Sequence, residues 1–418
     1  MPARASSDTA LRLTQKEADR ICARHELLFS AKPGGARATF AWRDLTDLDL
    51  SNRNLADADF TGAVLEGCRL VGARLDHAIF FGADLQGADL SEASLRRADL
   101  RGACMRGADL TGADLFEADL REGSIAAVDA EKGLRVLQPT RRVGEAHGVI
   151  LAGANLERSK LSGVTAVRAD FTDAVLKDAK MVRANLKQCS MQGCDLSGAD
   201  LSGADLSGAD LRDAVMVGAI IHQCITTGAR MDGMLSDSPA GRDVAHMPYE
   251  QMIRDHALWC ESQGRDGAPS SFDGADLRAL NTIKGFDLTA LSAKGAVFYG
   301  LDMEGVQLQG AHLEGADLRH CNLRRADLRG ARLNRARLSG ADMRDAQLGP
   351  LLLGHDRVMP CDLTSAALKG ADLRGADLRQ ALMIRADLSR ADLSGAQVRP
   401  SDLVGAQTHG TKGLPKAC

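Results

Sequence analysis

The sequence contains few of the residues that build an ordinary globular core. Only 3% of its 418 residues are aromatic and ten are proline, while 44% are hydrophobic. Most of that hydrophobic fraction is Ala and Leu, so we expect an interior of small and aliphatic side chains. An excess of one charge is also lacking, because 52 basic and 56 acidic residues leave a net charge of −4. This balance argues against nucleic-acid binding through bulk basicity.

Several functional signals are missing as well. No run approaches the roughly 18 consecutive apolar residues of a membrane-spanning helix, and residues 1–8 lack the apolar stretch of a secretory signal. Ten cysteines in a chain of this length do not suggest a disulfide framework. Motifs for phosphate loops, dinucleotide binding, zinc proteases and serine hydrolases are absent. We therefore expect a cytoplasmic, non-catalytic protein with no metal ion, no cofactor and no membrane contact.

What the sequence has instead is a repeat of five residues. Every fifth residue over 40–125 is Leu, Phe, Met or Ile, and the same spacing returns in new frames over 151–221 and 283–403. Of these 58 positions, 56 carry a large apolar residue. A small residue, most often Ala, stands two positions earlier, and Asp or Asn lies between the two. Ser, Thr or Arg follows, and then often Gly.

Neither regular secondary structure explains this period. Five residues would rotate an α-helical stripe by about 140° at each step, and a strand alternates with a period of two. The chain must therefore turn a corner every few residues, with Gly or a polar residue at the turn, so that each Leu and Ala faces one common axis. In the most regular repeats the predicted core positions are Leu85, Leu90, Leu196, Leu201, Leu206, Leu373 and Leu378.

The tandem A(D/N)LXX pattern resembles the pentapeptide-repeat proteins. It is clearest in the run Cys194-Asp-Leu-Ser-Gly-Ala-Asp-Leu, and it extends over roughly three quarters of the chain. The resemblance implies an all-β fold, a right-handed quadrilateral β-helix with four pentapeptides per coil and the Leu and Ala side chains inside. At the usual strand spacing of about 4.8 Å between coils, the three blocks would hold about four, four and six coils.

Residues 1–39 precede the repeat and predict a short amphipathic helix. Thr14 and Glu17 have the spacing of a capping box, and apolar residues follow at intervals of three and four. An open β-helix end exposes unpaired edges and an apolar core, so it requires a cover. We expect this helix to be such a cap, packing through Ile21, His25 and Leu28.

Residues 232–271 repeat the same plan. Pro248 suits a first helical position, and the apolar stripe of the first helix recurs 231 residues later. Phe272 then opens the repeat as Phe40 does, which indicates an internal duplication of helix and β-helix. This second helix is expected to be a cap or a junction, packing through Ile253, His256 and Trp259. Both histidines lie on the apolar faces and are interpreted as packed, hydrogen-bonded residues.

The repeat is also interrupted at 126–150. Twenty-six residues separate Ile125 from Leu151, one more than five repeats, so the frame slips. We expect a loop or short hairpin here, either neutral or the partner-binding element, because binding commonly uses loops on rigid scaffolds. The candidate partner-binding residues are Asp129, Glu131, Lys132, Arg135, Arg141 and Arg142. A second irregularity, at 349–360, keeps the five-residue phase and is expected to disturb the coil less.

The predicted organisation follows from these boundaries. The segments are an N-terminal helical region 1–39, repeat block 40–125, excursion 126–150, repeat block 151–231, helical junction 232–271, repeat block 272–408 and tail 409–418. Six cysteines take the small position of the repeat, where free Cys behaves as a buried apolar residue. They are Cys68, Cys189, Cys194, Cys224, Cys321 and Cys361.

Surface charge gives the remaining functional signal. Residues 44–125 have a net charge of −8, and residues 311–348 have a net charge of +3. The chain also resembles, more distantly, the quinolone-resistance group of the pentapeptide-repeat family, whose members bind type II topoisomerases by mimicking DNA with an acidic surface. Here many core Leu residues are followed by Arg, which would neutralise such a surface. We therefore predict a scaffold or adaptor for a protein partner, with a DNA-mimic modulator of gyrase or topoisomerase IV as the alternative. No direct nucleic-acid contact is expected, and the sequence is compatible with a homo-oligomer.

Overall fold

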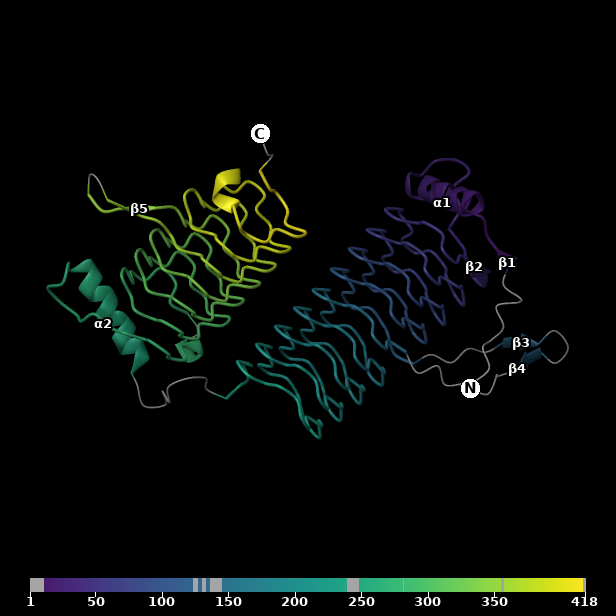
Figure 1. The fold of residues 1–418 in the computed structure, drawn as a ribbon, viewed down its shortest axis with the longest axis horizontal. Coiled ribbons are helices and arrows are strands. Elements are labelled where there is room, and N and C mark those ends of the chain that lie inside the picture. The colour runs from purple at the N-terminus through teal and green to yellow at the C-terminus, as the bar shows by residue number, and fades with distance from the viewer. Residues whose placement is uncertain are drawn as a thin grey trace. The chain divides into compact units, whose positions relative to one another are not determined.

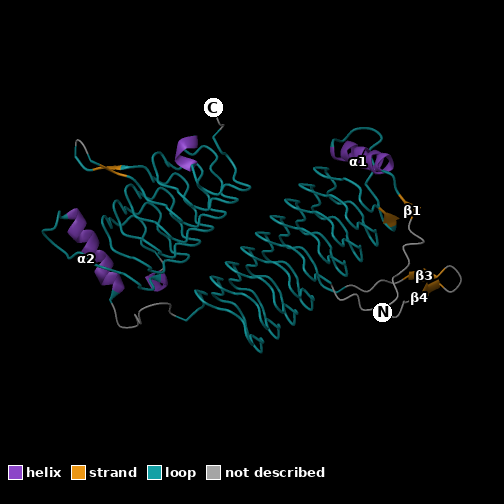
Figure 2. Ribbon diagram, viewed as in Figure 1, coloured by secondary structure: helices purple, strands orange, loops and turns teal. Residues whose placement is uncertain are grey.

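The repeats wind into coils that close every twenty residues. In the computed structural model, parallel bridges join residues twenty apart, so that Asp59 pairs with Thr39 on one side and Ile79 on the other. Such bridges recur at every fifth residue, which gives four per coil. Figures 1 and 2 show the coils as stacked rungs made largely of turns rather than long strands. The predicted β-helix is thereby confirmed, with 20-residue coils of four pentapeptides.

The structure describes residues 11–122, 127–129, 133–135, 145–238, 248–280, 282–354 and 357–415. Chain contacts divide it into unit 1, Met1–Ser238, and unit 2, Pro239–Cys418. Each unit has its own hydrophobic core.

Local chemistry explains each corner of a coil. At a representative corner the amide of Ala204 donates to the carbonyl of Leu201 at 2.9 Å, which closes a tight turn. Gly203 within that turn has φ of 65°, a left-handed conformation that glycine adopts without strain. The carboxylate of Asp200 accepts from the backbone amide of Ser202 at 3.1 Å and fixes the start of the turn. The repeat is therefore a turn-forming sequence, with one inward-facing pair per turn.

The interior consists of stacked columns of these inward side chains. All seven core leucines predicted from the most regular repeats have no exposed surface. One column begins with Phe40, Phe60 and Phe80, whose rings stack at centroid distances of 5.0 and 4.6 Å. Five of the six cysteines at small positions are buried, and burial raises the pKa of Cys68 and Cys189 to about 12. Cys224 is half-buried, because it belongs to the last coil of unit 1, where Ile221 is 57% exposed.

Unit 1 is one continuous stack. It begins with β1 (Leu11–Arg12), α1 (Gln15–Phe29) and β2 (Arg43–Asp44), and β1 pairs in parallel with β2. After residue 122 the chain leaves the coil and forms the antiparallel pair β3 (Ala127–Asp129) and β4 (Gly133–Arg135). Bridges resume at Glu145, which pairs with Cys104, and the residues on either side of the excursion stack directly on one another. The repeats before and after the excursion therefore share one core.

Unit 2 starts with α2 (Tyr249–Glu261) and continues into its own stack, with short 3-10 turns η2 (Arg278–Leu280) and η3 (Pro400–Leu403). The irregularity at 349–360 forms the antiparallel pair β5 (Leu351–Leu352) and β6 (Val358–Met359), which Figure 1 shows as an arm leaving the stack. Leu353 and Val358, which follow the five-residue phase, are 41% and 53% exposed. Their expected core placement is wrong. The insertion adds ten residues, two full repeats, so its phase is kept although it lies outside the coil.

Candidate functional site

The partner-binding residues predicted from sequence fall on the excursion. Glu131, Lys132, Arg141 and Arg142 lie outside the described residues. For the other two, the backbone places Asp129 opposite Gly133 and Arg135 opposite Ala127, at the two ends of the β3–β4 pair. The segment thus contains a short hairpin, while its side-chain arrangement is not described.

The two buried histidines make the same contacts in both helical modules. In α1, His25 Nδ1 accepts from the amide of Ala38 at 3.0 Å, and Nε2 lies 2.8 Å from the carbonyl of Ala56. In α2, His256 Nδ1 accepts from the amide of Ser270 at 3.0 Å. Its Nε2 lies 3.2 Å from the carbonyl of Thr289. Both rings are therefore neutral, with the hydrogen on Nε2.

The other helix residues predicted to pack against the coils differ in how far they are buried. Ile253 is buried, whereas Ile21 and Trp259 are half-buried. Leu28 does not pack as predicted, because it is 47% exposed near the C-terminal end of α1. Pro248 is the N-cap of α2 rather than its first helical residue. The capping box of Thr14 and Glu17 is present in full at the start of α1.

The N-terminal module also pairs with backbone groups of the first coil. Gln15 Nε2 donates to the carbonyl of Asp49 at 2.8 Å, and its Oε1 accepts from the amide of the same residue at 2.9 Å. The amide of Leu13 donates to the carbonyl of Asp44 at 2.9 Å. These bonds satisfy polar groups that have no coil beyond them. Arg53, in the first coil, adds an ion pair with Asp19 of the helix at 2.8 Å.

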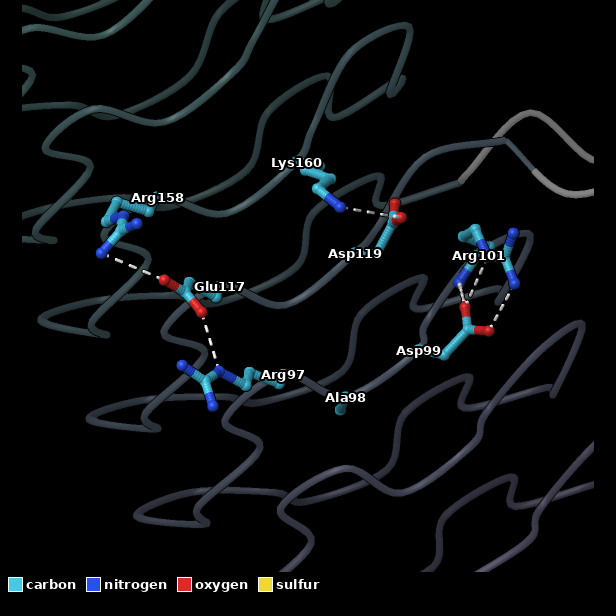
Figure 3. Close-up of a pocket in the computed structure, with 8 residues that line it drawn as sticks. All are labelled: Arg97, Ala98, Asp99, Arg101, Glu117, Asp119, Arg158 and Lys160. Carbon is cyan, nitrogen blue, oxygen red and sulfur yellow. Dashed lines mark hydrogen bonds and ion pairs between the residues drawn. The ribbon is translucent and has the colours of Figure 1, made fainter. Parts of the chain in front are cut away.

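A charged groove of about 520 Å³ lies on unit 1 where the chain leaves and rejoins the stack. Its residues come from three neighbouring coils, two before the excursion and one after it. Figure 3 shows the charged side chains along the groove. The lining residues are Arg97, Ala98, Asp99, Arg101, Glu117, Asp119, Arg158 and Lys160.

The acids of this groove are already engaged by arginines. Arg101 holds Asp99 through two hydrogen bonds of 2.8 and 2.7 Å, and Arg121 holds Asp119 at 2.9 and 2.7 Å. Glu117 accepts from Arg97 Nε at 2.7 Å, which lowers the pKa of this carboxyl. Burial opposes the ionisation of Asp119, but the bonds from Arg121 keep its pKa below the usual value. Glu117 and Asp119 are therefore carboxylates at neutral pH.

The cations of the groove are engaged less completely. Arg158 reaches Glu117 Oε1 through one terminal nitrogen at 3.1 Å. Lys160 Nζ lies 3.9 Å from Asp119 Oδ2, beyond hydrogen-bonding distance, and Asp119 is already held by Arg121. The guanidinium carbon of Arg158 lies over the Phe116 ring, 5.7 Å from the ring centroid. The guanidinium carbon of Arg96 lies 4.6 Å from the same centroid. The groove therefore combines fully paired carboxylates with cations that keep unused donors.

Sequence reasoning missed this groove, although the sequence contains a signal. Lys160 occupies the repeat position that usually carries Asp or Asn, and Arg97 and Arg158 occupy the corner position that usually carries Gly. Both arginines have left-handed φ, of 56° and 59°. Glu117 departs from Gly at the same position in the coil between them, and this stacking becomes visible only when the 41-residue offset across the excursion is known.

Along the rest of the stack, Asp and Arg form regular local pairs. An arginine two residues after the aspartate grips it through Nε and a terminal nitrogen, in the same manner as Arg101 and Asp99. Among the described residues of both units, and with Arg101 and Arg121 of the groove included, nine arginines make this contact: Arg101, Arg121, Arg212, Arg278, Arg319, Arg329, Arg344, Arg374 and Arg379. Many of the aspartates before core leucines are thus neutralised by their own repeat.

Comparison with known families agrees with this geometry. The family model "Pentapeptide repeats" matches residues 44–80, 78–115, 150–188, 179–218, 189–228, 307–345 and 361–397. The chain belongs to the pentapeptide-repeat family. Proteins of this family fold as right-handed β-helices and are generally non-enzymatic.

Solved structures of the family resemble the chain only in part. HetL, involved in heterocyst differentiation regulation in the cyanobacterium Nostoc, is 22% identical over 95% of this chain and 93% of its own, with a TM-score of 0.19. Rfr23 from the cyanobacterium Cyanothece is 25% identical over 31% of this chain and 91% of its own, with a TM-score of 0.24. QnrB1, a plasmid-mediated fluoroquinolone resistance protein, is 18% identical over 56% and 95%, with a TM-score of 0.21. No curated protein matches the sequence.

Within the described ranges, no group of three or more His, Cys, Asp or Glu side chains is placed to hold a metal ion. Of the helices in the described part of the chain, none has the length and hydrophobicity needed to cross a membrane.

Proposed function

We propose that this pentapeptide-repeat protein is a non-catalytic scaffold or adaptor that binds a protein partner through the excursion between residues 122 and 145. The observation that supports this is the continuity of the stack on both sides of the excursion. Asp119 bridges Lys160, and Cys104 bridges Glu145, as if no residues intervened. The inserted segment therefore contributes nothing to the bridges it spans, and its sequence is free to serve recognition.

The coil faces themselves offer less to distinguish one partner from another. Their outward positions repeat a few residue types, and many of their charges are paired within one repeat. We propose further that α1 and α2 cap their stacks. Gln15 and His25 bond to coil backbone groups in unit 1, and His256 does so in unit 2. Such caps would keep exposed edges from pairing with other chains.

The DNA-mimic alternative requires free carboxylates along one face. On the groove face, Asp99 and Asp119 are both held by their own arginines. Arg96 and Arg106 pair across coils with Asp114 and Glu145, at 2.7 and 2.5 Å. These pairs reduce the phosphate-like charge that a topoisomerase would meet, and they favour the scaffold.

The test is an excision that keeps the coil in register. Glu145 occupies the position twenty-one residues beyond the one that an uninterrupted repeat would place after Cys104. Deleting 123–143 therefore restores a continuous pentapeptide pattern. A tagged full-length protein and this variant are compared by quantitative affinity purification from cells that make the protein. We expect the melting temperature to stay within a few degrees and the captured partner to be lost.

The matched control excises the other hairpin. Residues 349–360 are replaced by Arg-Gly, the pair found at 329–330. This replacement also removes a projecting hairpin and keeps the five-residue register. We expect partner capture to survive it. Capture that survives the 123–143 deletion would place the contact on the coil faces or the helices. Inhibition of gyrase supercoiling by the full chain, lost at high salt, would favour the topoisomerase alternative.

A further inference from the structure

The charged groove is a second candidate contact, separate from the excursion residues. We propose that it binds a short acidic peptide segment, whose carboxylates are held by Arg97, Arg158 and Lys160. This inference rests on the proposed function, because the peptide would belong to a protein partner.

The groove has more hydrogen-bond donors than its own acids can use. Five cations, the four lining the groove and Arg121, face three acids. Each acid already accepts an arginine hydrogen bond of 2.9 Å or shorter. Among the described residues, no acceptor lies within hydrogen-bonding distance of Lys160 Nζ, and Arg97 bonds to Glu117 through Nε alone. A ligand carboxylate would use donors that the protein leaves unused.

Two arginines of the groove are held in place by neighbouring side chains. Glu117 lies between Arg97 and Arg158 and holds one nitrogen of each, at 2.7 and 3.1 Å. The ring of Phe116 supports the guanidinium of Arg158 from one side. The two arginines are thus oriented before any ligand arrives, so less side-chain freedom is lost on binding. Figure 3 shows Glu117 between them.

The charge around the groove favours a short acidic ligand over a long polyanion. Two of the three coils that form the groove belong to residues 44–125, whose net charge is −8. A long polyanion such as DNA would extend beyond the groove onto this acidic surface and be repelled. A short peptide can place a few carboxylates on the cations, while its own backbone amides face the groove acids. Mixed charge of this kind selects a partner more than it raises affinity.

The experiment uses the full chain and a fluorescein-labelled hexaglutamate peptide, measured by fluorescence anisotropy at low and physiological salt. A hexaglutamine peptide and a single-stranded oligonucleotide of equal charge are the comparison ligands. The test variant is Arg158→Gln/Lys160→Gln. The control is Arg168→Gln/Lys187→Gln, which removes the same charges elsewhere on the stack. Arg168 and Arg158 are both exposed corner residues with φ of 59°, so the backbone demand is matched.

We expect hexaglutamate to bind the wild type and the control equally, and the test variant about tenfold or more weakly, since each lost charged contact is substantial. All variants should melt close to the wild type, because the replaced side chains are exposed. Equal binding by the test and control variants, or no binding to the wild type, would overturn the proposal. So would equally tight binding of the oligonucleotide, which would indicate a general polyanion site.

The deletion of 123–143 separates this proposal from the proposed function. Peptide binding should survive that deletion, because the groove residues lie in the coils. If the peptide fails to bind while the deletion still abolishes partner capture, the groove inference falls and the scaffold function stands. If the peptide binds but partner capture does not depend on the excursion, the groove inference stands and the excursion is not the partner-binding element. Loss of peptide binding on deletion would place the peptide on the excursion and overturn the groove assignment.

Discussion

At the scale of single residues, the aspartate before each core leucine organises its own corner. Asp44 Oδ1 accepts from both the amide and the hydroxyl of Thr46, at 2.9 and 2.6 Å. Where arginine follows, as in the pair of Asp210 and Arg212, the guanidinium takes the place of the hydroxyl. Such local bonds compete with helix and strand formation and favour turns. The Asp or Asn of the repeat is therefore structural, and the large number of these residues is not a signal of a catalytic or metal site.

The core leucine of the same repeat allows a direct test. Leu206 has no exposed surface, and its amide donates to the carbonyl of Ile225 in the next coil at 2.7 Å. Leu206→Arg would place an unpaired charge inside the column. We expect a loss in the free energy of unfolding on the order of 4 kcal/mol. The measurement is the urea midpoint or melting temperature of the variant. A melting temperature within two degrees of the wild type would contradict the inward placement.

The adjacent residue supplies the control. Ser207 bonds through its hydroxyl to Asp205 at 2.5 Å, so an arbitrary replacement would lose this contact. Ser207→Arg should be tolerated, because Arg212 makes the equivalent bidentate contact with Asp210 in the following repeat. The comparison of Arg at 206 and at 207 thus varies only the direction of the side chain.

At the scale of elements, the two helices are held by neutral histidines. Burial is the main cause that lowers the pKa of His25 and of His256, and it outweighs the hydrogen bonds to carbonyl groups that act in the other direction. Protonation would convert Nδ1 from an acceptor into a donor facing the amide of Ala38 or Ser270. The helices are therefore attached by contacts that depend on pH.

The stability that these two histidines contribute should decrease as the pH falls. The unfolded chain binds the proton near the ordinary histidine pKa of about 6.5, whereas the folded chain binds it at lower pH. The contribution of the histidines is therefore complete above about pH 6.5, and it is lost as the pH falls toward the folded pKa values. The urea midpoint should decrease between pH 7.5 and 5.5 in the wild type and decrease less in His25→Gln/His256→Gln.

The window is chosen to exclude the carboxylates, which titrate near pH 4 in unfolded chains. The exposed His222 provides the control, since His222→Gln removes one imidazole and leaves both buried rings. A double variant with the same pH slope as the wild type would show that the buried histidines do not produce the dependence.

The β5–β6 hairpin gives a second element-scale prediction. Leu351 and Met359 cover Gly330 on the coil face, whereas Leu352 is 71% exposed. Replacing 349–360 by Arg-Gly leaves the core leucines 348 and 363 five residues apart, as in every regular repeat. We expect the variant to melt at or above the wild-type temperature, because an arm with exposed apolar residues is removed while the column is kept.

A register variant checks this explanation. Replacement of the same segment by Arg-Gly-Gly adds one residue, so every following side chain would have to shift its position. It should be strongly destabilised or lose the C-terminal coils, as measured by melting and by amide exchange. If both replacements melt alike, the column does not depend on the five-residue register.

At the scale of the whole molecule, the chain consists of two units with separate cores. In a solenoid each coil contacts mainly its neighbours, so stability is close to a sum over coils and their interfaces. Unit 1 has one core shared by the coils before and after the excursion, and unit 2 has a core that begins at Tyr249 and Phe272. Each unit starts from its own helix. The expected consequence is that damage in one unit stays within it.

Hydrogen exchange measured by mass spectrometry tests this independence. In Leu206→Arg, amides of residues 145–235 should lose protection, whereas those of residues 282–348 should exchange as in the wild type. Two separate thermal transitions, of which only one moves with the substitution, would agree. A uniform loss of protection across both units would instead mean that they unfold as one cooperative body.

Much of the fold could be predicted from the sequence, but little of the candidate site could. The excursion and the capping box of Thr14 are visible as breaks in the period and as a local motif. The groove is not, because Arg97, Glu117 and Arg158 are adjacent only through stacking, across offsets of 20 and 41 residues. Leu353 failed for a related reason, since it follows a five-residue pattern that the chain has already left.

The sequence alone determined the five-residue period, the inward positions and the turn at each corner, because these depend on bonds within one or two repeats. Only the tertiary structure decided which repeats stack on which, since that depends on the length of each insertion. The excursion after residue 122 shifts the pairing by 21 residues, and the hairpin at 349–360 shifts it by ten. Contacts between coils, including the groove, arise from those offsets.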